Sequence, residues 1–173
     1  MKKLVFILGG ARSGKSRYAV KLAKKNKGKT IFIATAIALD IEMKERIRLH
    51  KISRPHSWKV IEEPKDISGV LRALGKSYST VLVDCLGLWV LNLLMVSAKD
   101  KEIEKRIKEL ISSILKTKVA EVIVVSNEVG EGIVPVDSLS RRFRDLLGLA
   151  NQSIAEKADE VVFMQAGIPV KIK

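Results

Sequence analysis

The 173-residue chain contains one cysteine, Cys85, and this scarcity excludes both a disulfide within the chain and a zinc site built from cysteines. A long apolar run is also missing. The longest, residues 85–96, is interrupted by Asn92 and is far shorter than the ~20 residues needed to cross a bilayer. The short run at 4–8 is followed at once by Arg12 and Lys15, unlike an export signal. We therefore expect a cytoplasmic protein without a membrane span.

Aromatic residues make up only 5% of the chain, and acidic residues are absent from the first 29 positions, which hold ten lysines and arginines. With a formal net charge of +13, this basic segment fits a nucleic-acid surface, a field that attracts nucleotides, or a solvated helix face. Stacking of single-stranded bases needs aromatic side chains, so their scarcity weakens the first interpretation. We expect nucleotide ligands and no nucleic-acid partner.

One strong motif is present, a glycine-rich stretch with the phosphate-loop spacing G-x-x-x-x-G-K-[ST]. The apolar run 4–8 precedes it and a helical segment, 17–25, follows it, which is the strand–loop–helix setting that this motif requires. Lys15 would reach the β- and γ-phosphates and the Ser16 hydroxyl would bind Mg²⁺. We expect the Lys15 side chain to be exposed until phosphate binds. The predicted nucleotide-binding loop consists of Gly9, Gly10, Ala11, Arg12, Ser13, Gly14, Lys15 and Ser16.

Apolar runs and helical patterns alternate along the rest of the chain. Further strands are predicted at 30–35, 80–84, 122–125 and 161–164, with an antiparallel edge strand at 168–172 and only a short extended piece at 59–64. Helices are predicted at 39–50, 67–74 and 86–96, from a capping-box pattern at Ser97 onward, and from Asp137, with Ile154 on the stretch beyond that helix. The helix at 86–96 is apolar nearly all round, so we expect it to be buried in the core or in an oligomer contact. This alternation predicts an α/β protein with a three-layer P-loop NTPase fold, a mostly parallel sheet and one catalytic domain spanning 1–173.

Two of these helices carry apolar stripes. The stripe at 39–50 contains Leu39, Met43, Ile47 and His50, and on these residues alone His50 is favoured as a core histidine. The helix after Ser97 is predicted to bury one face made of Ile103, Ile107, Leu110, Ile111, Ile114 and Leu115.

Two predicted strands end in polar residues. Asp84 ends the strand at 80–84, which is typical of the carboxylate that faces Mg²⁺ in P-loop enzymes. Asn127 and Glu128 follow the strand at 122–125, at the sheet edge where open parallel sheets place their sites. The role of Glu128 stays open.

From residue 4 to its last residue, the chain resembles the bifunctional adenosylcobinamide kinase/adenosylcobinamide-phosphate guanylyltransferase family of cobalamin biosynthesis. The most specific likeness lies in the stretch from Asn127 to Pro135. The other matching stretches are 9–17, 33–36, Glu42-Met43 with Arg46-Ile47 and His50, Arg54-Pro55 with Trp58, 84–92, 143–145, Asn151-Gln152, 158–161, Gly167 and Lys171.

The resemblance implies two reactions at one site. The first phosphorylates adenosylcobinamide with ATP or GTP, and the second transfers GMP from GTP to adenosylcobinamide phosphate through a guanylylated histidine, which falls on His50. Some family members have a second histidine where this chain has Leu49. The resemblance also implies a homotrimer. It further implies nucleotide contacts at Ala34, Thr35, Ala36, Lys51, Ile52, Ser53, Arg54, Glu62 and Asp84, with Mg²⁺ at Ser16 and Asp84.

Two other functions remain as alternatives at this stage. A kinase of another small metabolite would need the phosphate loop and Asp84 but no histidine nucleophile. A nucleic-acid-stimulated ATPase depends only on the positive charge, and stimulation of turnover by DNA would distinguish it.

Overall fold

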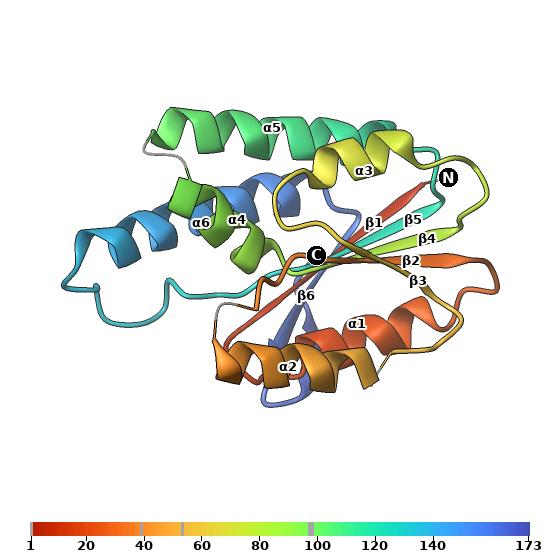
Figure 1. Ribbon diagram of the computed structural model, residues 1–173, viewed down its shortest axis with the longest axis horizontal. Coiled ribbons are helices and arrows are strands. Elements are labelled where there is room, and N and C mark those ends of the chain that lie inside the picture. Colours follow the sequence, from red (N-terminus) through yellow and green to blue (C-terminus); the bar gives the residue numbers. More distant parts are fainter. Residues whose placement is uncertain (1, 39, 53, 97–98) are drawn as a thin grey trace.

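The computed structural model describes residues 2–38, 40–52, 54–96 and 99–173. Its centre is a seven-stranded sheet with helices on both faces, so the predicted three-layer α/β fold is confirmed (Figure 1). The strand order is β3-β2-β4-β5-β1-β6-β7, and every neighbouring pair is parallel except β6 and β7. The strands are β1 (Lys3–Gly9), β2 (Thr30–Ala34), β3 (Lys59–Glu62), β4 (Thr80–Asp84), β5 (Glu121–Val125), β6 (Glu160–Gln165) and β7 (Ile168–Lys171).

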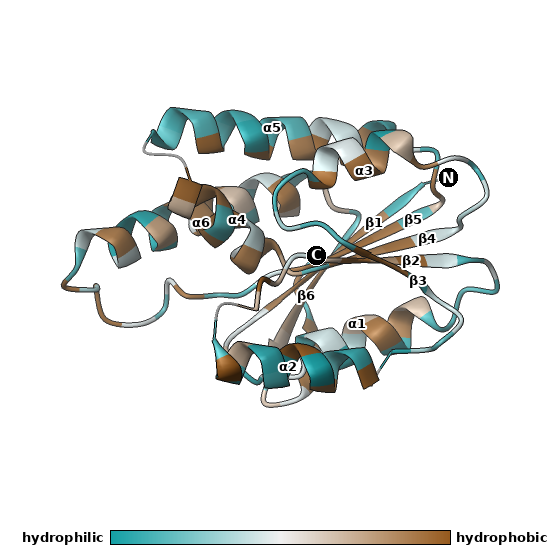
Figure 2. Cartoon of the chain, viewed as in Figure 1, coloured by the Kyte–Doolittle hydropathy of each residue, from teal (hydrophilic) through white to brown (hydrophobic). Residues whose placement is uncertain are grey.

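The continuous apolar runs form central strands because both faces of the sheet are covered by helices. Successive side chains of β1 point to opposite faces, so Phe6 joins one hydrophobic cluster while Val5 and Ile7 join the other. Figure 2 shows this hydrophobic interior along the middle strands and more hydrophilic residues along the outer helices. The helices are α1 (Lys15–Ala23), α2 (Ile41–Ile52), α3 (Ile67–Ala73), α4 (Leu86–Val96), α5 (Asp100–Lys116) and α6 (Ser138–Lys157).

The helices are divided unevenly between the two faces. Helices α3, α4, α5 and α6 cover one face, and α1 covers the other with α2 beside it (Figure 1). The predicted burial of α4 is confirmed for Trp89 and Leu93, among others, whereas Met95 and Val96 at its end are exposed. None of the helices in the described part of the chain is long and apolar enough to cross a membrane.

Several predicted boundaries needed correction. The segment at 59–62 is a seventh strand, because it pairs in parallel with β2 even though Ile61 alone is partly buried. Helix α6 runs without a break to Lys157, so Ile154 belongs to it. Leu115 is exposed on α5, not buried with that helix's apolar face. The predictions at Leu39, Ser53, Ser97 and Ala98 fall outside the described residues.

The predicted antiparallel edge strand is confirmed, and the hairpin that it forms also contacts the glycine-rich loop. Strands β6 and β7 form a hairpin whose turn, Ala166-Gly167, lies against the glycine-rich loop. The Gly167 N–H donates a hydrogen bond of 3.1 Å to the carbonyl of Ser13. The end of the chain therefore supports the loop that follows β1.

The carboxyl ends of the parallel strands meet at one edge of the sheet. Ala34 at the end of β2 pairs with Asp84 at the end of β4, and Asp84 in turn pairs with Val125 of β5. Side chains that are distant in the sequence therefore gather at this edge, as expected for an open α/β sheet.

Candidate functional site

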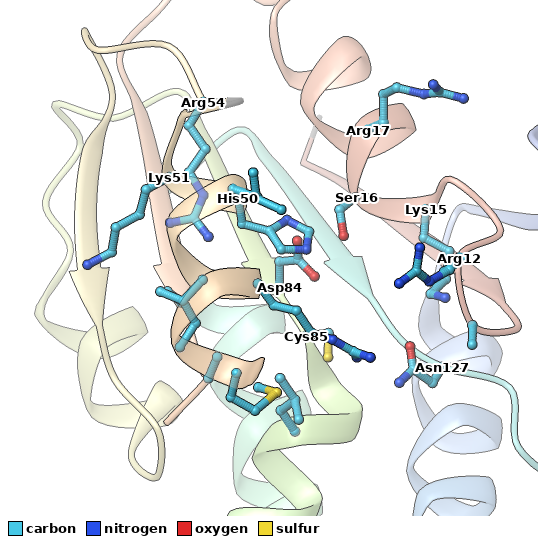
Figure 3. Close-up of a pocket in the computed structure, with 18 of the residues that line it drawn as sticks. Arg12, Lys15, Ser16, Arg17, His50, Lys51, Arg54, Asp84, Cys85 and Asn127 are labelled. Carbon is cyan, nitrogen blue, oxygen red and sulfur yellow. The ribbon is translucent and has the colours of Figure 1, made fainter. Parts of the chain in front are cut away.

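A cavity of about 820 Å³ opens at the carboxyl edge of the sheet, between the glycine-rich loop and α2 (Figure 3). Most of the predicted site residues line it together. They are Ala11, Arg12, Ser13, Gly14, Lys15, Ser16, Ala34, Ala36, His50, Lys51, Arg54, Glu62 and Asp84. Gly9, Gly10, Thr35 and Ile52 are not among the lining residues, and Ser53 lies outside the described part of the chain.

The loop from Gly9 to Ser16 is shaped as an anion cradle. Gly9, Arg12 and Gly14 adopt positive φ angles of 152°, 54° and 91°, which turn the loop tightly into the first turn of α1. The N-terminal turn of a helix carries unpaired N–H groups and a partial positive charge, so phosphate is stabilised there. The Ser13 hydroxyl is buried and has no hydrogen-bond partner in the described residues, which leaves it available inside the loop.

Lys15 differs from its prediction. Its side chain is only 7% exposed, because Nζ folds back and donates a 2.6 Å hydrogen bond to the carbonyl of Gly10. Burial lowers the pKa of this ammonium, and the nearby thiol of Cys85 and carboxyl of Asp84 oppose that shift. The expectation of an exposed lysine was therefore wrong, and the lysine is already held within the loop that would bind phosphate.

Gly9 is required by close packing. A Cβ atom at this position would lie 2.5 Å from the backbone carbonyl of Met164, whereas nothing lies within 4 Å of a Cβ at Gly10. We predict that Gly9→Ala lowers the free energy of unfolding by about 3 kcal/mol, because an alanine there would have a strained backbone and a Cβ in steric conflict with Met164. Gly10→Ala is the matched control and should change it by less than about 0.5 kcal/mol. Urea unfolding measures both, and equal stabilities would contradict the packing argument.

Asp84 occupies the centre of the site. Burial raises the pKa of its carboxyl, while a hydrogen bond from the Ser16 hydroxyl and the neighbouring side chains of His50, Arg54 and Lys15 act in the opposite direction. A hydroxyl and a carboxylate side by side are the oxygen ligands that suit Mg²⁺, which completes its shell with water and substrate phosphates. No group of three histidine, cysteine or acidic residues that could hold a metal occurs in the described residues, so the nucleotide would have to supply further ligands.

Arg54 brings an unusual positive group to the same cavity. Its guanidinium lies 3.6 Å from the centre of the Phe32 ring, and its Nε and Nη1 are buried without hydrogen-bond partners among the residues described. Burial lowers its pKa, and the negative charges of Asp84 and Glu62 oppose this effect. Buried donors of this kind are costly unless an acceptor pairs with them, so the site is suited to an anionic ligand.

Helix α2 places His50 beside these groups, and Figure 3 shows the imidazole directed toward Asp84. No residue of α2 is buried, so the interpretation of His50 as a core histidine was wrong. The apolar stripe faces the cavity instead, because Met43 and Ile47 line it together with His50. An ion pair of 2.6 Å between Lys51 and Glu62 joins the end of this helix to β3.

Thr35 lies behind the cavity wall. Its hydroxyl donates to the carbonyl of Cys85 at 2.7 Å and accepts from the Cys85 N–H at 2.8 Å, so it holds the chain that follows Asp84. Burial raises the pKa of the Cys85 thiol to about 12, which keeps it protonated. A nucleotide contact by Thr35 stays a prediction.

Asn127 lines the cavity although the sequence assigned it no role. The available signal was its position directly after a predicted strand, and only the strand order shows that this end lies beside the glycine-rich loop.

The chain is similar to known proteins along almost its whole length. The family model described as cobinamide kinase / cobinamide phosphate guanyltransferase matches residues 5–172. Bifunctional adenosylcobalamin biosynthesis protein CobP from Pseudomonas aeruginosa is 42% identical over 167 residues, covering 96% of this chain and 95% of the relative. The CobU proteins of the same description from Escherichia coli and Salmonella typhimurium are each 37% identical over 182 residues, covering 98% of this chain and 99% of the relative.

A solved structure, the RadB recombinase, shares the fold. It superposes with a TM-score of 0.53 at 14% sequence identity, covering 93% of this chain and 73% of the recombinase. A likeness at this identity concerns the fold alone.

Proposed function

Because the chain belongs to the cobinamide kinase / cobinamide phosphate guanyltransferase family, we propose that its single cavity carries out two successive reactions. In the first, ATP or GTP phosphorylates the aminopropanol hydroxyl of adenosylcobinamide. In the second, GMP passes from GTP to that phosphate, giving adenosylcobinamide-GDP and pyrophosphate. The observation that carries the proposal is that Lys15 of the loop and His50 of α2 line one cavity.

The kinase step needs positioning and charge neutralisation more than covalent chemistry. The loop N–H groups and Lys15 would hold the β- and γ-phosphates. Asp84 and Ser16 would hold Mg²⁺, which neutralises phosphate charge when it is bound. Arg54, with its open donors, supplies a further positive group to the same cavity.

The guanylyl step needs a nucleophile, and His50 is suited to it because it lines the cavity on an exposed helix. A neutral imidazole nitrogen would attack the α-phosphorus of GTP, forming an N–P bond as the bond to the departing pyrophosphate breaks. An oxygen of adenosylcobinamide phosphate would then attack the same phosphorus and release His50. Leu49 also lines the cavity, so this chain offers one histidine where some relatives have two.

The assembly we propose is the homotrimer that the family resemblance implies. The supporting observation is an exposed apolar segment after β5, in which Ile133 and Val136 are each 96% exposed. Large exposed apolar surfaces mark protein contacts. Light scattering should give three times the chain mass, and a monomer at micromolar concentration would contradict this assembly.

Isotope transfer tests the two reactions. With γ-labelled ATP and adenosylcobinamide, label should reach the corrinoid. With α-labelled GTP, label should reach first the protein and then the corrinoid phosphate. Phosphorylation of another metabolite in place of the corrinoid would overturn the substrate assignment, and corrinoid guanylylation without labelled protein would overturn the covalent route.

Asp84→Asn tests the proposed magnesium contact. Loss of one negative charge should raise the Mg²⁺ concentration for half-maximal kinase rate by about tenfold or more, while the fold is kept. Asp145→Asn, on the exposed face of α6, is the matched control and should behave as the unchanged protein. An unaltered magnesium titration in Asp84→Asn would assign this carboxylate a structural role.

A further inference from the structure

The backbone at the end of β5 is held in place from two sides. The N–H of Ser126 donates to the carbonyl of Ile7 at 2.9 Å, and that of Glu128 donates to the carbonyl of Gly9 at 3.0 Å, so this segment is fastened to β1 and to the start of the loop. From the other side, Asn151 of α6 donates its amide to the carbonyl of Asn127 at 3.0 Å. The buried Ser126 hydroxyl bonds Asn151 Oδ1 at 2.6 Å and fixes that amide's orientation.

This arrangement leaves the Asn127 side chain as the group presented to the cavity. It lies beside Arg12 and Lys15 in Figure 3, and its amide has no hydrogen-bond partner in the described part of the chain. Gly87, in the first turn of α4, lies next to it, because a Cβ atom there would be 3.4 Å from Asn127 Nδ2, an ordinary van der Waals distance. The amide therefore borders the cavity with its donor and acceptor open.

Asn127 and His50 lie at different sides of the site. The His50 side chain projects into the site from α2. The Asn127 side chain projects from the segment after β5, on the side of the glycine-rich loop (Figure 3). The loop holds the terminal phosphates of a nucleotide, so a group beside Lys15 meets the γ-phosphate before it meets the α-phosphate. The two side chains are thus suited to different bond-breaking steps.

We propose that Asn127 orients the acceptor in the phosphoryl transfer, a role that rests on the proposed kinase activity. Oδ1 accepts a hydrogen bond from the attacking hydroxyl and Nδ2 donates to an oxygen of the γ-phosphoryl group, since an amide offers both functions on neighbouring atoms. The acceptor oxygen forms a bond to the γ-phosphorus while the bond between the γ-phosphorus and the β,γ-bridging oxygen breaks. The hydroxyl proton passes to an oxygen of the transferred phosphoryl group, and the nucleoside diphosphate leaves. The amide takes no proton.

The neighbouring Glu128 is not suited to this role. Its Oε1 accepts a hydrogen bond from the N–H of Gly130, so it stabilises the turn after β5, and it is not among the residues that line the cavity. Glu128→Gln keeps an acceptor oxygen for that N–H and serves as the matched control for changes at Asn127.

The test measures the two half-reactions separately. Asn127→Ala should lower kcat for corrinoid phosphorylation by about 100-fold with KM for ATP within about threefold, because the lost contacts act on the attacking group. Covalent labelling by α-labelled GTP should stay within about threefold of the unchanged protein, which also shows that the variant folds. Asn127→Asp keeps the acceptor oxygen and loses the donor. Its kcat for corrinoid phosphorylation should therefore lie between those of Asn127→Ala and the unchanged protein.

Each other outcome overturns the role. An unchanged kinase rate in Asn127→Ala removes Asn127 from the transfer, and an equal loss of labelling and phosphorylation makes it a general nucleotide contact. A loss in Glu128→Gln as large as in Asn127→Ala would attribute the effect to the shape of the turn. If the unchanged protein phosphorylates no cobinamide, the proposed function fails first, and this role with it.

Discussion

Lys15→Ala is expected to reduce both corrinoid phosphorylation and guanylyl transfer by about 1,000-fold or more. In the proposed mechanism both reactions place a triphosphate on the same loop, and the loop lysine would supply the positive charge that faces its terminal phosphates. The side chain is already buried against the carbonyl of Gly10, so its charge is in position before the nucleotide arrives. Initial rates with γ-labelled ATP and α-labelled GTP measure the two losses.

The fold should survive this change. Removing Nζ leaves the Gly10 carbonyl without its donor, which costs about 1 kcal/mol of unfolding free energy. Lys21→Ala, at an exposed position of the same helix, controls for loss of positive charge in this basic segment. Near-normal kinase turnover in Lys15→Ala, or an equal loss in Lys21→Ala, would remove the loop lysine from the mechanism.

His50→Ala is expected to abolish covalent labelling and guanylyl transfer and to keep ATP-dependent phosphorylation within about threefold of the unchanged protein. The histidine lines the cavity as a nucleophile would, whereas the kinase step needs only positioned phosphates and an acceptor. The bond to GMP would be a phosphoramidate, which acid breaks and base does not. Treating labelled protein with acid and with base therefore identifies the linkage.

The chain offers a natural control, because it contains only two histidines. His56 is exposed and is not among the residues that line the cavity. His56→Ala should keep both labelling and transfer. Label that persists in His50→Ala and disappears in His56→Ala would reverse the assignment.

The parallel core was predictable from the sequence because strands buried on both faces carry continuous apolar runs, residues 4–8 in β1 and 81–83 in β4. Strand β3 was missed as a member of the sheet because it lies at an edge, where only Ile61 is partly buried and the apolar signal is weak. The length of α6 was underestimated, because the helix continues to Lys157 through Gly148, a residue type that disfavours helix interiors.

The site was predictable where chemistry is local and unpredictable where it depends on packing. The loop motif specifies its own strand–loop–helix setting, so the position of Lys15 and Ser16 at the cavity could be predicted from spacing. A stripe such as Met43, Ile47 and His50 has the same period whether it faces a core or a cavity, and only the tertiary structure distinguishes the two. The stacking of Arg54 on Phe32 joins segments that are distant in the sequence, and no local sequence pattern predicts it.

The hydrogen bond between Gly167 and Ser13 affects how the nascent chain can fold during translation. The two partners come from opposite ends of the chain, and β1 lies between β5 and β6, both of which follow it by more than half of the sequence. A ribosome therefore releases the glycine-rich loop well before β5, β6 and the turn at Gly167 that contacts it. A nascent chain cannot complete this loop's surroundings until Gly167 has emerged, so the proposed phosphate site forms long after the loop itself is synthesised.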